Sequence, residues 1–293
     1  MGGGAPVSVL LSFGHGYSAR ALTPSLLAEG WEVIGTTRSE EKAAALRAEG
    51  VTPAIFGADL AAEIARATHV LVSAGPGEDG DPGLNTYRDA LALHLGRMDW
   101  VGYLSTTGVY GDHGGGWVDE ATPLAPSTRR GRWRVEAEAA WQRFASETGA
   151  PLHVFRLAGI YGPGRGPFAK VRAGTARRIV KPDQVFSRIH VEDIAQVLRA
   201  SMARPRAGGI YNLCDDDPAP PQDVIGHAAE LLGLPPPPEI AFDEAEMSPM
   251  ARSFYAESKR VRNDRIKTEL GVHLRYPDLR AGLTDLLRRE RNG

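Results

Sequence analysis

Residues 7–19 read VSVLLSFGHGYSA and join a short apolar run to a glycine-rich turn. The run at 7–13 is dominated by branched apolar residues, as expected of a buried strand in a parallel sheet. A helical pattern follows at 18–29 and ends at Gly30. The turn fits G-x-G-x-x-A, a weak motif alone but specific between a buried strand and a helix, where it binds a dinucleotide.

Each small residue of this turn has a physical role. Gly14 allows the tight turn, Gly16 lets a pyrophosphate approach the backbone, and Ala19 lets the helix pack on the strand. The helix N-terminus then offers free N–H groups to the diphosphate. The alternative is an ordinary glycine-rich turn. The predicted cofactor loop consists of Gly14, His15, Gly16, Tyr17, Ser18 and Ala19.

The end of the second predicted strand, at 31–36, selects the cofactor. An acidic residue there would bond the ribose hydroxyls of NAD. This chain has TTRS at 36–39 instead, so Arg38 is predicted to hold the 2′-phosphate of NADP. NAD remains the alternative, with Arg38 as a plain surface residue.

Two further segments are predicted to line the cofactor. Asp59 follows a weak strand at 54–56, where it can contact the adenine or cap the next helix. Ser73 ends a buried strand predicted at 69–73, and Ala74 and Gly75 begin the loop that follows it.

Apolar runs alternate with helical patterns over the first 160 residues. This alternation predicts right-handed crossovers and an α/β fold with a doubly wound parallel sheet, the Rossmann fold. The looser pattern after about residue 160, broken by prolines at 218–221 and 235–238, predicts a smaller C-terminal lobe. We expect 1–160 to form the nucleotide-binding domain, with 188–215 returning to it, and 161–187 with 216–293 to form the lobe. The other predicted strands are 100–105 and 152–157, and the other predicted helices are 39–48, 60–67, 87–95 and 132–148.

The composition limits the class of protein. The net charge of −2 over 293 residues favours neither nucleic acid nor an acidic membrane surface as a partner. The lone Cys214 excludes an internal disulfide and a cysteine-type zinc site, and no metal site is predicted. No signal peptide and no run of about 20 apolar residues is found, so we expect a cytoplasmic protein.

Four segments beyond the glycine loop carry a family resemblance, in order along the chain. They are YLSTTGVYG (103–111), FRLAGIYGPGR (155–165), RIHVEDIA (188–195) and IYNLCDD (210–216). With these segments the chain resembles the extended and atypical short-chain dehydrogenase/reductases, in the NAD-dependent epimerase/dehydratase group. The resemblance implies that the C-terminal lobe binds the substrate. It also implies a catalytic Ser/Thr, a Tyr that exchanges a proton with the substrate, and a Lys that holds the nicotinamide ribose.

The resemblance puts Thr106 at the Ser/Thr position. The Tyr-x-x-x-Lys motif should fall at RGRWR (130–134), so Arg130 replaces the tyrosine and Arg134 the lysine. A guanidinium has no acceptor and does not deprotonate in proteins, so Arg130 is no general acid/base. Arg134 can still donate to the ribose.

Other tyrosines are candidates for the missing proton carrier. Tyr110 and Tyr161 follow predicted strands on the side of the sheet where ligands bind. The string from Tyr255 to Lys259 also spells Tyr-x-x-x-Lys, but it lies in what we interpret as a surface helix running to Gly271.

Cations after the YGPG turn are candidates for substrate binding. Arg165, Lys170 and Arg188 are predicted to grip an anionic or sugar group, with solvent exposure as the alternative. His190 is expected to be structural, with Asp193 capping or bracing the same helix start.

Two functions follow from these predictions. The first is an NAD(P)-dependent oxidoreductase or epimerase acting on a small hydroxylated or sugar-related substrate, with Thr106 binding the reacting oxygen. The second is a nucleotide-binding redox sensor or scaffold with little or no catalysis, which the replaced dyad favours. The resemblance also implies a dimer formed through two helices per subunit, and Trp133 and Trp141 make the long helix at 132–148 the predicted apolar seam of a homodimer.

Overall fold

The computed structural model describes residues 7–292. Much of the stretch on which the signal-peptide prediction depends, residues 1–6, lies outside this range. The helices are α1 (Tyr17–Ala28), α2 (Glu40–Ala48), α3 (Ala61–Arg66), α4 (Pro82–His94), α5 (Arg129–Thr148), α6 (Phe168–Arg172), α7 (Val191–Ala203), α8 (Pro221–Leu232), α9 (Pro249–Phe254), α10 (Asp264–Thr268) and α11 (Leu279–Asn292), with 3₁₀ turns η1 (Leu95–Arg97) and η2 (Thr107–Tyr110).

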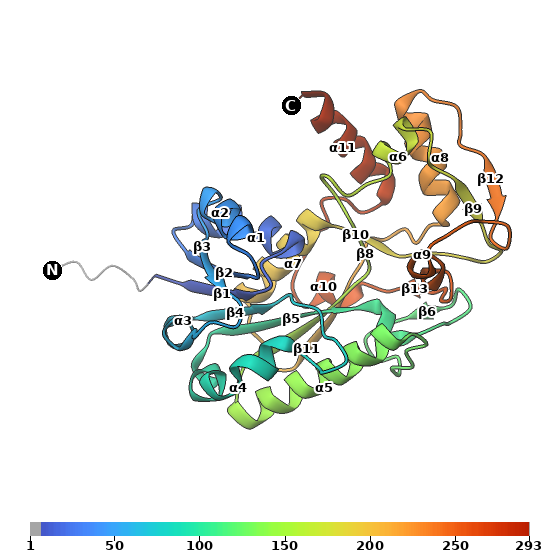
Figure 1. Cartoon of the computed structure of the whole chain (residues 1–293). Coiled ribbons are helices and arrows are strands. Elements are labelled where there is room, and N and C mark those ends of the chain that lie inside the picture. Colours follow the sequence, from blue (N-terminus) through green and yellow to red (C-terminus); the bar gives the residue numbers. More distant parts are fainter. Residues whose placement is uncertain (1–6, 293) are drawn as a thin grey trace. The chain divides into compact units, whose positions relative to one another are not determined.

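Seven strands form one central sheet in the order β11-β7-β5-β4-β1-β2-β3. In chain order they are β1 (Val9–Phe13), β2 (Glu32–Thr37), β3 (Thr52–Ile55), β4 (His69–Val72), β5 (Trp100–Thr106), β7 (Leu152–Leu157) and β11 (Gly209–Leu213). β1 pairs in parallel with β2 and β4, and parallel pairing continues to β3 and β5. The predicted doubly wound parallel sheet is therefore confirmed (Figure 1).

Six shorter strands form three parallel pairs outside this sheet. They are β6 (Trp117–Val118) with β13 (Arg260–Val261), β8 (Gly159–Tyr161) with β10 (Arg188–His190), and β9 (Arg178–Val180) with β12 (Glu239–Ala241). The predicted surface helix over 255–271 is wrong, because α9 ends at Phe254 and β13 precedes the short α10.

The start of α4 also differs from the prediction. The helix begins at Pro82, not at residue 87. Asp81 caps it by accepting from the amides of Gly83 at 3.0 Å and Leu84 at 3.1 Å. Pro82 fits the first helical position, where no N–H is needed.

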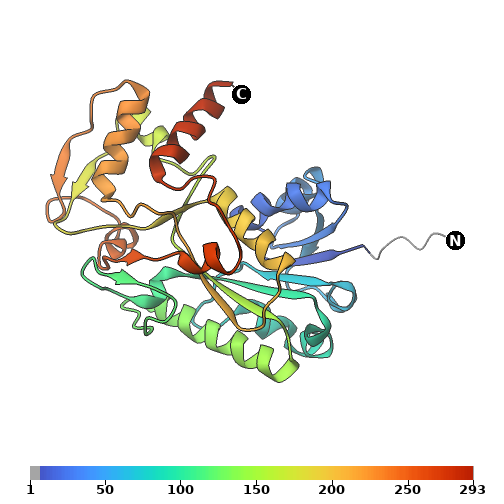
Figure 2. The same cartoon turned by 180° about the vertical axis from the view of Figure 1, so that it is seen from behind.

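The chain divides into two compact units. Within the described residues, the first unit comprises 7–105, 133–156 and 194–211, and the second comprises 106–132, 157–193 and 212–292. In the first unit, α4 and α5 cover one face of the sheet. Figure 2 shows the same arrangement from the opposite side to Figure 1.

Each unit has its own apolar core. In the first, Leu11, Val70 and Val101 of the sheet are fully buried, and Trp141 of α5 packs in the same cluster. In the second, Phe168 of α6 and Leu283 of α11 are buried together with Tyr161. None of the helices within 7–292 combines the length and the apolar character needed to cross a membrane.

Candidate functional site

The turn between β1 and α1 requires glycine at its first position. Gly14 has φ +78°, and a Cβ there would lie 2.8 Å from the backbone nitrogen of Ala74. The Gly14 amide donates to Thr36 Oγ1 at 2.7 Å, and the His15 amide donates to the Thr36 carbonyl at 3.1 Å. The turn is therefore fixed to the end of β2 and leaves no room for a side chain beside β4.

Gly16 lies in open space. A Cβ at this position would meet only the Gly14 carbonyl oxygen, at 3.7 Å. Gly16 is the N-cap residue of α1, and no side chain of the described chain caps that helix. The amides of Ser18 and Ala19, in the first turn, have no acceptor among the described residues. An uncapped helix start beside an open glycine fits a diphosphate, because both donors and space are provided.

His15 fills the space on the other side of the turn. Its Nε2 lies 3.0 Å from Thr23 Oγ1, and its ring is so close to Gly35 that a Cβ on Gly35 would be 2.7 Å from His15 Cγ. Burial lowers the pKa of His15 to about 4. The ring is therefore neutral at pH 7 and packs the loop against β2.

Arg38 is the cation at the end of β2. Its side chain is exposed and makes no hydrogen bond or ion pair with any described residue. Thr36 is buried and bonded to Gly14, while the Ser39 hydroxyl caps α2 by accepting from the Lys42 amide at 3.4 Å. No carboxylate follows β2 before Glu40 in α2. This end of the strand therefore presents a guanidinium with its donors unused.

A cleft of about 840 Å³ lies in the first unit. It includes the predicted residue Asp59, whose Oδ1 accepts from the Ala61 amide at 3.0 Å just before α3 without capping that helix. Leu84 and Asn85 were not predicted to lie here, because the sequence pattern starts the helix only at residue 87. The cleft is lined by Gly57–Ala61, Gly80, Asp81, Leu84–Ala90, Glu136, Ala137 and Ala140.

Arg134 lies at the carboxyl ends of β4 and β5. Its Nη1 donates to the Leu104 carbonyl at 2.7 Å and to the Tyr103 hydroxyl at 3.3 Å. Its Nη2 would lie 3.6 Å from a Cβ on Gly75. The structure therefore brings the predicted residues Arg134 and Gly75 together. Arg130, in contrast, is exposed.

A buried ion pair joins α5, one turn after Arg134, to β7, and it was not predicted. Arg156 Nη2 donates to Glu138 Oε2 at 2.8 Å, and both side chains are at most 4% exposed. The hydroxyl of Ser105 donates to the same carboxylate. Glu138 thus links α5 to β5 and β7. The only signal in the sequence for these contacts is the position of Glu138 in a helix that is predicted between two strands.

The predicted proton carriers lie in the second unit with their hydroxyls buried. The Tyr110 hydroxyl donates to Asn212 Oδ1 at 2.7 Å. The Tyr161 hydroxyl faces the backbone of Gly282 in α11, and burial raises its pKa. Thr106 is half-buried, and its Oγ1 accepts from the Gly108 amide at 3.2 Å. This geometry argues against acid–base roles for both tyrosines.

The Tyr255–Lys259 string is not a catalytic dyad in this structure. Lys259 Nζ donates to the Gly111 carbonyl at 2.7 Å and to Glu257 Oε2 at 2.6 Å. The ring of Tyr255 packs against Phe186 at a centroid distance of 5.5 Å. Both side chains therefore have other partners.

The remaining predicted cations differ in their surroundings. Arg165 and Lys170 are exposed. Arg188 is half-buried, and its Nη1 donates to the carbonyls of Phe186 at 2.9 Å and Ala219 at 3.0 Å. Residues 7–292 contain no cluster of three or more His, Cys, Asp or Glu side chains arranged to hold a metal ion.

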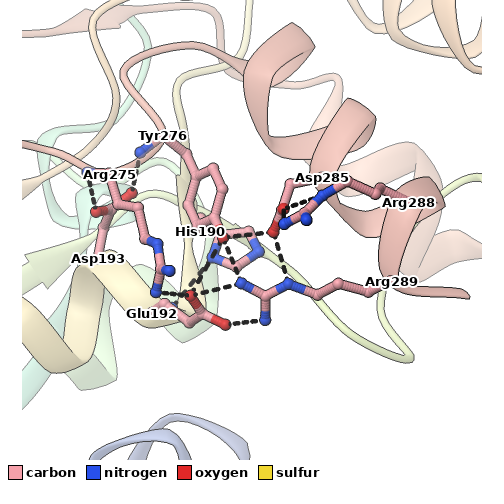
Figure 3. Close-up of polar contacts among 8 residues, drawn as sticks. All are labelled: His190, Glu192, Asp193, Arg275, Tyr276, Asp285, Arg288 and Arg289. Carbon is pink, nitrogen blue, oxygen red and sulfur yellow. Dashed lines mark hydrogen bonds and ion pairs between the residues drawn. The ribbon is translucent and has the colours of Figure 1, made fainter. Parts of the chain in front are cut away.

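His190 belongs to a polar network that anchors α11 (Figure 3). Its Nδ1 accepts from the Glu192 amide at 3.2 Å, and its ring centroid lies 4.1 Å from that of Tyr276. The Tyr276 hydroxyl donates to Asp285 at 2.6 Å, and Arg289 pairs with Glu192. Asp193 accepts from the Tyr276 amide at 3.1 Å. These contacts give His190 and Asp193 structural roles.

The sheet, the glycine turn and the uncapped α1 together define a dinucleotide-binding protein of the Rossmann type. The family model described as "NAD dependent epimerase/dehydratase family" matches residues 90–214. The chain belongs to this family.

Relatives and solved structures agree with this assignment. Protein YeeZ of Escherichia coli K12 is 30% identical over 281 residues, which cover 90% of this chain and 95% of YeeZ. The 3-diazoavenalumate denitrifying reductase of a Streptomyces species is 30% identical over 181 residues, which cover 57% of this chain and 58% of the reductase. The structure of a functionally unknown conserved protein from Silicibacter pomeroyi is 57% identical, with a TM-score of 0.91 over 97% of this chain and 99% of that one.

Proposed function

We propose that this protein is an NADP-dependent reductase that reduces a small substrate without a tyrosine proton donor. The observation that carries the proposal is the exposed Arg38, whose donors are unused directly after β2, where no acidic residue precedes Glu40. A planar guanidinium binds phosphate oxygens in pairs, whereas the ribose hydroxyls of NAD are best accepted by a carboxylate.

The first unit supplies the other contacts for this cofactor. The amides of Ser18 and Ala19 would hold the diphosphate beside Gly16. Asp59 and its cleft would take the adenine. Arg134 would donate through Nη2 to the nicotinamide ribose, since its Nη1 is already bonded to Leu104 and Tyr103. The bound cofactor supplies the hydride.

The reaction direction follows from the missing tyrosine. Epimerisation and dehydration of a sugar begin by removing hydride and proton from an alcohol, which needs a base at the hydroxyl. Arg130 cannot act as that base, and the hydroxyls of Tyr110 and Tyr161 are buried. Reduction of an electron-poor carbon needs the hydride first. Thr106 would then stabilise the developing negative charge by a hydrogen bond from its hydroxyl, because its oxygen already accepts from Gly108, and water would supply the proton that completes the reduction. The name of the Streptomyces relative, a reductase, supports this direction.

Turnover of the reduced cofactor tests the proposal. Purified protein is mixed with NADPH and a panel of aldehydes, ketones and nucleotide sugars, and the absorbance of NADPH is followed. We expect oxidation with at least one reducible substrate and a loss of about 10²-fold in kcat for Thr106→Ala. The control Thr107→Ser, at the neighbouring position, should retain activity. Equal rates for both variants would contradict the role of Thr106.

A second candidate is a nucleotide-binding redox sensor or scaffold. It is favoured by the same buried tyrosine hydroxyls and by Arg130 at the tyrosine position. NADPH binding without turnover across the whole panel would support the sensor and reject the reductase.

We also propose that the protein works in the cytoplasm and forms a homodimer through α5. Trp141 is fully buried in the monomer, so such a contact would use the polar outer side of the helix. Light scattering of the purified protein tests the dimer, and a monomer at high concentration would reject it.

A further inference from the structure

Three aromatic rings gather in the second unit, outside the predicted cofactor site. They belong to Phe186, Phe242 and Tyr255, and we call them the aromatic cluster. The centroid of the Tyr255 ring lies 5.5 Å from that of Phe186 and 5.2 Å from that of Phe242. All three side chains are half-buried, so each ring keeps some surface for another planar group.

Arg188 lies beside this cluster and is held rigidly. Its guanidinium carbon is 5.8 Å from the Phe186 ring centroid. Nη1 donates to the carbonyls of Phe186 and Ala219 at 2.9 and 3.0 Å, and these two residues also exchange backbone hydrogen bonds of 3.1 and 3.2 Å with each other. The guanidinium is thus fixed to an antiparallel bridge.

One edge of this guanidinium is unused. Nε and Nη2 of Arg188 have no acceptor among the described residues. These two nitrogens form the side of an arginine that binds a carboxylate through two parallel hydrogen bonds. Because the side chain is already immobilised, binding there loses little conformational entropy.

The nearby acid does not neutralise this arginine. Asp215 is the carboxyl group that interacts most strongly with Arg188. It is only 1% exposed, neither oxygen accepts a well-formed hydrogen bond from the described residues, and burial raises its pKa to about 8. Burial thus disfavours its charged form, and no ion pair joins it to Arg188 among the described residues. The positive charge of Arg188 is therefore available to a ligand.

We infer that the aromatic cluster and the Nε–Nη2 edge of Arg188 together bind a planar aromatic carboxylate. The ring of the ligand stacks on Tyr255 and meets Phe186 edge to face, because these two rings lie at 73° to each other, and its carboxylate accepts from Arg188. A single charge suits the site, since the flanking cations are already engaged: Lys181 donates to the Tyr255 carbonyl and Arg252 donates to that of Ala245 at 2.8 Å. We take this aromatic carboxylate as the substrate class of the proposed reductase, and only this last step rests on the proposed function.

Calorimetry of the full chain without cofactor tests the site. The probes are benzoate and 4-hydroxycinnamate, compared with cyclohexanecarboxylate, which has the charge without the aromatic ring, and benzamide, which has the ring without the charge. We expect both aromatic acids to bind at least tenfold more tightly than either control compound. Equal affinity for cyclohexanecarboxylate would overturn the stacking role, and tighter binding of UDP or inorganic phosphate would overturn the carboxylate class.

Variants separate the contacts. Arg188→Gln should weaken 4-hydroxycinnamate binding about 10- to 100-fold, as expected for a charged hydrogen-bond pair. The matched control is Arg177→Gln, because Arg177 also donates through Nη1 to two carbonyls, at 2.9 and 2.8 Å, but lies exposed. Arg188→Lys and Tyr255→Leu give further tests should Arg188→Gln unfold, and each should weaken binding at least fivefold. Equal affinity in all four variants would overturn the inference.

The same titration distinguishes this inference from the proposed reductase. Absence of aromatic acid binding, with NADPH turnover on other substrates intact, would overturn the site and leave the reductase standing. Binding that depends on Arg188, with no turnover of any substrate, would support the site and reject the reductase.

Discussion

The β1–α1 turn and the start of α5 are both parts of the dinucleotide-binding family pattern. This chain keeps the pattern in the turn and departs from it at the start of α5. The turn keeps Gly14, Gly16 and Ala19, and its geometry fits a diphosphate. The start of α5 has arginine at both dyad positions, and Arg134 is bonded to Leu104 and Tyr103.

The difference reflects what each region offers a ligand. The turn works through backbone amides and empty space, which only glycine provides, so any larger residue would remove the site. The dyad works through side-chain chemistry, which can change while the helix stays in place. Cofactor binding and proton transfer are thus separable in this fold.

The largest expected effect concerns the contribution of α5 to stability through the ion pair between Glu138 and Arg156. Glu138→Ala leaves Arg156 buried without its partner, so we expect a loss of about 3–5 kcal/mol in the free energy of unfolding. Urea denaturation measures it. The exposed Glu136→Ala on the same helix should change stability by less than about 0.5 kcal/mol. A Glu138→Ala loss below 1 kcal/mol would mean that this carboxylate does not hold the helix.

The next effect concerns pH and the turn. The pKa of His15 falls from 6.5 to about 4 on folding. A depressed folded pKa contributes stability that is present above pH 6.5 and is lost as the pH falls through 4. This corresponds to roughly 3 kcal/mol. His15→Gln should therefore reduce the loss of stability between pH 7 and pH 4, measured by thermal unfolding. An identical pH profile in the variant would show that His15 is protonated as readily in the folded as in the unfolded chain.

The two glycines of the turn should fail in different ways. Gly14→Ala forces a Cβ toward Ala74 at a positive φ, so we expect a stability loss of about 2 kcal/mol or more. Gly16→Val has an extended backbone and open space, so stability should change by less than about 0.5 kcal/mol while NADPH affinity falls about 100-fold. Unfolding and calorimetry on both variants give the comparison. Normal NADPH affinity in Gly16→Val would place the diphosphate elsewhere.

The smallest effect concerns cofactor choice. Arg38→Ala should weaken NADPH binding about tenfold and leave NADH binding unchanged, because only the 2′-phosphate needs the guanidinium. Arg47→Ala, at the other end of α2, is the control. A parallel loss for both cofactors would assign Arg38 a structural role.

Much of the fold could be predicted because periodicity and turn residues are local signals. The run before Gly14 and the Ser39 cap indicated the correct elements. The start of α4 was missed, although Asp81 and Pro82 carry a capping signal. Residues 255–259 were predicted as helical, but in the fold Lys259 is bonded to Gly111, a contact distant in sequence.

The site was less predictable for the same reason. The open space at Gly16 follows from the motif, whereas the attachment of Arg188 to Ala219 depends on two segments about 30 positions apart meeting in the fold. The burial of the Tyr110 hydroxyl against Asn212 likewise joins residues about a hundred positions apart. Such contacts are set by tertiary packing, which a single sequence does not display.

The most direct measurement is calorimetric titration of the unmodified protein with NADPH and NADH under identical salt and pH. We expect one binding site per chain and at least tenfold tighter binding of NADPH than of NADH. Failure to bind either dinucleotide would contradict the dinucleotide site at the β1–α1 turn, and equal affinities would contradict the role given to Arg38.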